Sequence, residues 1–72
     1  MDEQLPRRTL RQWREKVYFE TQEEFAQRLG VHETAISLWE TGRRHPRLRT
    51  RRIIAERLGL KPQQIIFEGD EE

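Results

Sequence analysis

The sequence predicts an all-α protein, a compact bundle of about five short helices in one small domain. Three observations lead to this prediction. Apolar residues recur at spacings of three and four, residues that cap helices precede several of these stretches, and no stretch alternates apolar and polar residues as a half-buried strand does. The chain of 72 residues is long enough for one hydrophobic core and too short for the deep cleft of a large enzyme.

The first helix is predicted at about residues 9–17. Leu10, Trp13 and Val17 lie at spacings of three and four and form its apolar face. Thr9, with a glutamine three residues later, matches a capping box, in which two side chains satisfy backbone amides at a helix start. We therefore expect the three apolar side chains to pack inward.

The second and third helices are predicted at about residues 22–29 and 33–40, with a short turn between them. The second helix starts behind Thr21, which has a glutamate three residues later, and it ends at Gly30, a residue suited to the left-handed conformation that terminates helices. The third helix starts behind His32, which we expect to be a weaker cap than serine or threonine.

The fourth helix is predicted at about residues 48–58, between a His-Pro pair that breaks the chain and Gly59. Its apolar stripe consists of Leu48, Ile54, Ala55 and Leu58. Pro62 suits the first position of a last short helix. The apolar residues of that helix, which face the core or a partner, are Ile65, Ile66 and Phe67.

The formal net charge of +1 conceals an uneven distribution of charged side chains. Residues 1–42 carry six basic and eight acidic groups, residues 43–61 carry eight basic groups and one acid, and residues 62–72 carry four acids. Six of the basic groups are arginines between positions 43 and 52, a density suited to phosphate contacts. On charge alone, a phosphate-binding segment and a solvated surface run fit equally well.

Several other classes of protein and site are not expected. The chain has no cysteine, which excludes disulfides and thiolate sites and favours a cytoplasmic location. No apolar run exceeds three residues, so we expect neither a secretory signal nor a membrane span. The two histidines, His32 and His45, lie in predicted turns without a catalytic or metal-binding pattern, so we expect no enzyme activity, no metal and no cofactor.

Residues 21–42, TQEEFAQRLGVHETAISLWETG, have the layout of a helix-turn-helix. They closely resemble the Cro and lambda-repressor-like, or XRE-type, family of DNA-binding domains. The resemblance covers about residues 10–67 and implies a lambda-repressor-like domain of five helices, whose third helix enters the major groove while the second braces it across the backbone. We accordingly place a flexible arm at residues 1–8, the DNA-binding domain at 9–67 and an acidic tail at 68–72.

The resemblance implies that the outer face of the third helix reads DNA bases. Glu33 and Thr34 match the family's principal base-reading positions, and Leu38 matches another one turn later. Glu33 can accept a hydrogen bond from cytosine, and Leu38 can pack on the methyl group of thymine. Alternatively, Glu33 is a carboxylate that the macrodipole stabilises at the helix start, and Leu38 is an ordinary exposed leucine. The base-reading candidates are Glu33, Thr34, Ser37 and Leu38.

Phosphate contacts are expected at both ends of the motif, from the start of the second helix and from the arginines after the third. They position the domain without reading sequence. The phosphate-contacting candidates are Gln22, Thr41, Arg43, Arg44, Arg47 and Arg49. For Arg49, an alternative is that its stem covers apolar surface. We assign no DNA contact to Arg51, Arg52 or Arg57.

The resemblance also places an acid at the end of the third helix against an arginine of the first. Glu40 and Arg14 fit these positions. A half-buried carboxylate without a partner is costly, so we interpret the pair as a structural ion pair rather than a reactive site. Residues 17–20 exceed the family pattern by about one residue and are more aromatic, which leaves the position of the arginine open by one residue.

These features predict a sequence-specific regulator that binds double-stranded DNA, a repressor that reads a short palindromic operator through the major groove. One such domain covers about half a site, so we expect a homodimer on DNA, with the residues Ile65, Ile66 and Phe67 as its interface. The alternative for these residues is ordinary core. The alternative function is an antitoxin or partner-recruiting protein, whose main role is to bind a protein such as a toxin.

Overall fold

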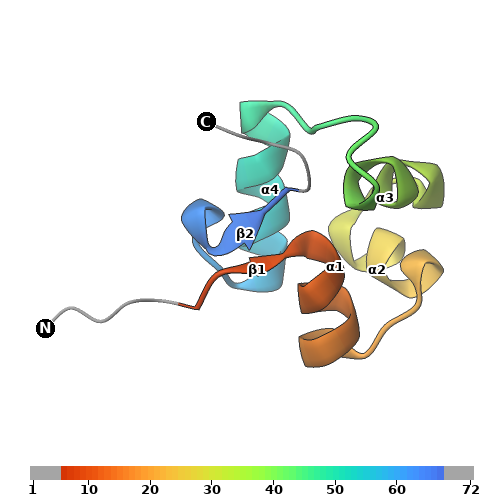
Figure 1. Ribbon diagram of the computed structural model, residues 1–72, viewed down its shortest axis with the longest axis horizontal. Helices are drawn as coiled ribbons and strands as arrows, with labels where there is room; N and C mark the ends of the chain where they lie inside the picture. Colours follow the sequence, from red (N-terminus) through yellow and green to blue (C-terminus); the bar gives the residue numbers. More distant parts are fainter. Residues whose placement is uncertain (1–5, 68–72) are drawn as a thin grey trace, which may run out of the picture.

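The computed structural model describes residues 6–67, and it confirms the predicted helical fold (Figure 1). The α-helices are α1 (Leu10–Gln12), α2 (Gln22–Leu29), α3 (Glu33–Glu40) and α4 (Leu48–Leu58). The π-helix η1 (Trp13–Tyr18) continues α1, and the 3₁₀ helix η2 (Pro62–Gln64) follows α4. The acidic tail at 68–72 and the first five residues of the predicted arm lie outside the described residues.

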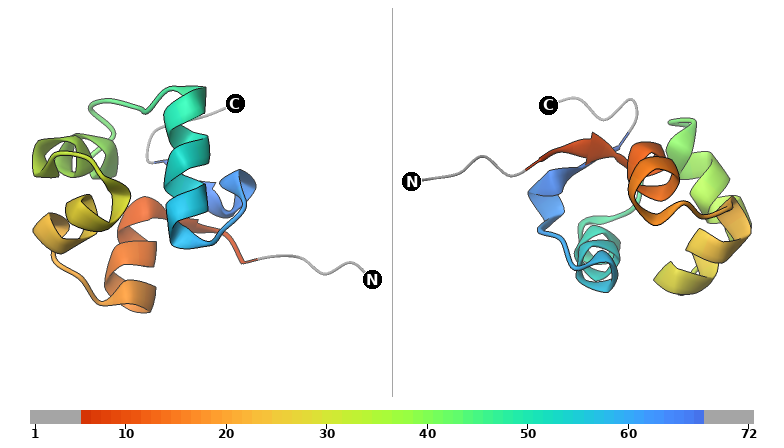
Figure 2. Two further views of the ribbon diagram at one scale, coloured as in Figure 1. Left: turned by 180° about the vertical axis from the view of Figure 1, so that it is seen from behind. Right: turned by 90° about the horizontal axis from the view of Figure 1, so that it is seen from below.

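The hydrophobic core lies where these helices meet. In Figures 1 and 2, α2 and α3 pack together on one side, and α4 on the other side reaches α2 and the C-terminal segment. Phe25, Leu29, Ile36 and Ile54 are almost completely buried, so α2, α3 and α4 each contribute to one core. Burying such side chains is the main driving force for folding in a domain of this size.

The first helix has the predicted capped start, but its second half differs from an α-helix. The amide of Gln12 donates to Thr9 Oγ1, and the side chain of Gln12 accepts from the amide of Thr9, so the capping box is present. From Trp13 to Tyr18 the chain is a π-helix, whose wider turn brings residue i+5 onto the face of residue i. Tyr18 therefore packs on the core, and the prediction that Val17 packs inward is wrong, because 38% of Val17 is exposed.

Two short strands join the first and the last part of the described chain, although the sequence shows no alternating pattern. β1 (Arg8–Thr9) and β2 (Ile65–Ile66) pair in parallel, with Arg8 opposite Ile65. Two-residue strands are too short for an alternating pattern, and main-chain pairing does not require particular side chains. Arg7 Nε also donates to the carbonyl of Gln63 over 3.0 Å. Arg7 and Arg8, which we placed in the flexible arm, thus contact Gln63 and Ile65.

The end of the chain shows two further differences from the predictions. The last short helix is a 3₁₀ turn followed by β2, and Ile65 and Phe67 are 6% and 3% exposed while Ile66 is partly buried. The prediction that these residues form a dimer interface is wrong for Ile65 and Phe67, because both are core. Leu48 is 63% exposed, so its prediction as part of the buried α4 stripe is wrong.

Candidate nucleic-acid interface

Helices α2 and α3 form a helix-turn-helix in which each helix start is capped by a side chain. The hydroxyl of Thr21 accepts from the amide of Glu24, and the carboxylate of Glu24 accepts from the amide of Thr21. Gly30 ends α2 with φ at 74° in the left-handed region. His32 Nδ1 then accepts from the amide of Thr34 over 3.0 Å, so this histidine does cap α3. These contacts fix where the second helix of the motif begins.

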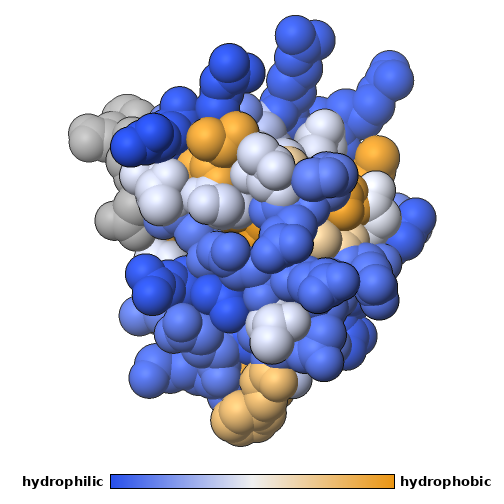
Figure 3. All heavy atoms as spheres, turned by 90° about the vertical axis from the view of Figure 1, so that its right-hand side faces the viewer, coloured by the Kyte–Doolittle hydropathy of each residue, from blue (hydrophilic) through white to orange (hydrophobic). Residues whose placement is uncertain are grey.

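The outer face of α3 carries the predicted base-reading residues. Glu33 and Thr34 are exposed, and Ser37 and Leu38 are partly buried. On the opposite side of the helix, Ile36 is completely buried. Figure 3 shows the side of the molecule on which α3 lies, where weakly polar and apolar side chains occupy a band below strongly hydrophilic side chains that project outward. The four predicted residues therefore share one accessible helix face.

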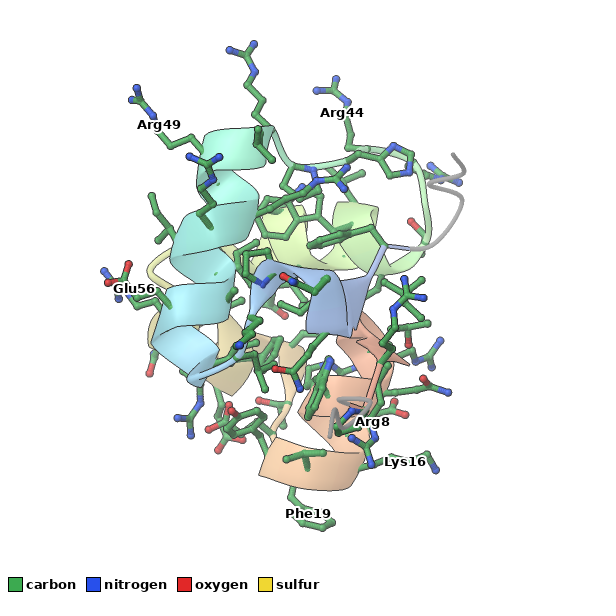
Figure 4. The ribbon with its side chains drawn as sticks, turned by 90° about the vertical axis from the view of Figure 1, so that its left-hand side faces the viewer. Arg8, Lys16, Phe19, Arg44, Arg49 and Glu56 are labelled. Carbon is green, nitrogen blue, oxygen red and sulfur yellow. The ribbon has the colours of Figure 1, made fainter. Side chains whose placement is uncertain are left out.

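The loop between α3 and α4, residues 41–47, which we call the arginine loop, places basic side chains beside that face. Arg43, Arg44 and Arg47 are exposed, as is Arg49 in the first turn of α4. Figure 4 shows Arg44 and Arg49 projecting from the same end of the molecule. The main-chain amide of Arg43 donates to the carbonyl of Leu38 over 3.0 Å, which ties the loop to the end of α3. These guanidinium groups have the geometry and charge to bind phosphates.

Two other predicted phosphate contacts, Gln22 and Thr41, already make hydrogen bonds inside the protein. The Thr41 hydroxyl donates to the carbonyl of Ser37 over 2.9 Å, so its one proton is engaged. Gln22 Nε2 donates to Glu40 Oε1 over 3.0 Å. An amide has a second N–H, so Gln22 keeps one donor for a phosphate, whereas Thr41 has to break its bond to donate to one.

A buried ion pair holds α3 against the first helix. Arg14 Nε donates to Glu40 Oε2 over 2.7 Å and Arg14 Nη2 donates to Glu40 Oε1 over 3.0 Å, and the two side chains are 10% and 2% exposed. Hydrogen bonding to Glu40 raises the pKa of Arg14 above its usual value, so the guanidinium stays charged. The structure thus brings together the two residues predicted as a pair.

Arg14 also supports the loop before α2, which the sequence did not reveal. Its Nη1 donates to the main-chain carbonyl of Glu20 over 2.9 Å. With Gln22 bonded to Glu40, one arginine–glutamate pair joins the first helix, the start of α2 and the end of α3. The contact of Arg14 with a main-chain carbonyl does not depend on a particular side chain, so it leaves no signal in the sequence. Gln22, a polar residue at a helix start, is equally compatible with a contact to DNA and a contact inside the protein.

Within residues 6–67, no group of three or more acidic, histidine or cysteine residues is placed to hold a metal ion. None of the helices described is both long and apolar enough to cross a membrane.

Comparison with known proteins identifies a family. The sequence profile of a family described as helix-turn-helix matches residues 10–65, which is more than half of the chain. This match supports the resemblance to Cro and lambda-repressor-like domains. No curated protein and no solved structure gave a significant match.

Proposed function

The chain belongs to this helix-turn-helix family, and on that premise we propose that it is a sequence-specific transcriptional repressor that binds a short palindromic operator. The family assignment supports DNA binding by a helix-turn-helix regulator. The specific role as a repressor, the symmetry of the site and the residues in contact are our proposal.

One observation carries the proposal: the accessible face of α3 is flanked by exposed arginines. Glu33, Thr34 and Leu38 present a carboxylate, a hydroxyl and an apolar group, which are suited to the edges of bases in the major groove. The exposed arginines of the arginine loop and of the α4 start provide charge for the phosphates that border this groove. The candidate base-reading face of α3 is thus followed by a loop that carries candidate phosphate-binding groups, an arrangement that suits recognition of a groove.

The proposed active form on DNA is a homodimer. One α3 helix reads a few base pairs, and a symmetric pair of helices meeting successive major grooves about 34 Å apart reads a palindromic site. Because Ile65 and Phe67 are buried in the core of each copy, they do not supply the contact between copies. A dimer that assembles on DNA, with the operator spacing holding the two copies, fits this burial.

Selection from a pool of randomised duplexes, followed by titration of the selected sequence against scrambled DNA, tests the function. The proposal predicts an inverted repeat with half-sites about ten base pairs apart and a preference over scrambled DNA of about a thousandfold or more. Enrichment of no sequence, with salt-sensitive binding to every duplex alike, would contradict the reader role and would favour the protein-binding alternative.

A further inference from the structure

Arg51 is the partly buried member of the run of arginines between positions 43 and 52, whose other five arginines are exposed. Its Nε donates to the carbonyl of Pro46 over 2.9 Å. Its guanidinium carbon lies 4.8 Å from the centre of the Phe67 ring. Arg51 therefore connects the arginine loop, on one side, to the residue that follows β2 on the other.

The arginine loop is fixed at two points. At the α3 end, the amides of Arg43 and Arg44 both donate to the carbonyl of Leu38, over 3.0 and 3.3 Å. At the α4 end, Pro46 is buried and its carbonyl accepts from Arg51. The N-cap residue of α4, Arg47, makes no side-chain capping bond. The hydrogen bond from Arg51 to the carbonyl of Pro46 therefore fixes the chain at this helix start in place of a side-chain cap.

Phe67 gives Arg51 a rigid support. The ring is 3% exposed, and the strand before it, β2, pairs with β1 at the other end of the chain. A guanidinium is planar and can stack on an aromatic ring while an N–H at its edge donates a hydrogen bond, whereas an ammonium group cannot match both contacts. The contacts of Arg51 thus depend on its being an arginine and not merely on its charge.

We propose that Arg51 is a positioning residue for DNA binding, which holds the arginine loop in the conformation that presents Arg43, Arg44 and Arg47 to phosphates, and that it does so through Phe67. This inference rests on the proposed function. A loop that is ordered before binding loses less conformational entropy in the complex, so fixing it increases affinity without adding a contact to DNA. Phe67 then contributes to DNA affinity although it is too deeply buried to touch DNA.

The test compares Arg51→Lys with Arg52→Lys, a matched control at the exposed neighbouring arginine of α4. Both substitutions keep the charge, so both variants should keep the wild-type dependence of affinity on salt. At temperatures well below the melting transition, Arg51→Lys should weaken binding to the selected operator about tenfold through loss of the stacked, bonded geometry. The control should bind as the wild type does. Wild-type affinity in Arg51→Lys, or an equal loss in both variants, would overturn the proposal.

A second arm uses the free protein and the variant Phe67→Leu, which removes the ring and keeps an apolar side chain. In amide NMR spectra, Arg51→Lys and Phe67→Leu should both shift the signals of Arg43, Arg44, His45 and Arg47, and the control should not. The double variant should bind DNA no more weakly than the single variant with the lower affinity, because both substitutions break the same contact between residues 51 and 67. Unchanged loop signals, or additive losses of affinity, would overturn the proposal. Wild-type protein that binds no duplex would instead refute the proposed function, and the loop signals would still decide whether Arg51 holds the loop.

Discussion

Replacing Arg14 with alanine tests the buried ion pair, and its effect can be worked out from the contacts. The substitution removes both of arginine's hydrogen bonds to Glu40 and the bond to the carbonyl of Glu20. Glu40, with a side chain 2% exposed, then keeps the bond from Gln22 Nε2 and loses its countercharge. Removing one partner of a buried pair typically costs about 3–5 kcal/mol.

A domain of this length has a free energy of unfolding of roughly 4–10 kcal/mol, so the loss is a large part of the total. At about 4–8 °C per kcal/mol, Arg14→Ala should lower the melting temperature by at least about 12 °C in circular dichroism or calorimetry at pH 7. Arg11→Ala is the control, because it removes an exposed arginine from the same helix and breaks a surface pair with Glu15 that contributes little. A loss below about 1 kcal/mol in Arg14→Ala, equal to that in the control, would show that the buried pair does not stabilise the fold.

Three other perturbations have defined outcomes. Arg43→Ala should weaken binding to operator and scrambled DNA alike and reduce the slope of affinity against salt by about 0.9; a changed base preference with the slope intact would show that Arg43 reads bases. Phe19 is 79% exposed with φ at 54°, a left-handed conformation that glycine adopts without strain, so Phe19→Gly should raise the melting temperature. Because Phe19 lies at the end of the molecule opposite Arg44 (Figure 4), the DNA affinity should not change. A lower melting temperature would contradict this prediction. Hydrogen bonding from Arg28 lowers the pKa of Glu20 below the ordinary 4.5, so the stability that this carboxylate contributes is present above pH 4.5 and is lost as the pH falls through its lower folded-state pKa. Glu20→Gln should therefore make the melting temperature decline less steeply as the solution is acidified. An unchanged decline would contradict the assignment.

The helix-turn-helix could be predicted from the sequence because its signals are local. The caps at Thr21 and Gly30 depend on residues within one helical turn, and α2, α3 and α4 have the predicted bounds. The same locality explains the predicted outer face of α3, since helical spacing alone separates Ile36 from Thr34 and Leu38.

The features that escaped prediction depend on contacts between distant residues or on an irregular backbone. The π-turn rotates Tyr18 inward and Val17 outward, and an α-helical period cannot anticipate that shift. The pairing of β1 with β2 joins residues 57 positions apart, Arg8 and Ile65, through main-chain bonds that leave no pattern in the sequence. Arg51 lies in a run of arginines that is typical of a protein surface. Its partly buried position depends on the ring of Phe67, which is distant in the sequence.

Repeating the duplex selection with Glu33→Gln tests whether the outer face of α3 reads DNA sequence. Glutamine has nearly the same size as glutamate but can donate as well as accept, so it favours adenine where a carboxylate favours cytosine. If Glu33 reads a base, the selected operator should change at one position in each half-site and stay the same elsewhere. An identical operator from the wild type and the variant would contradict base reading by Glu33.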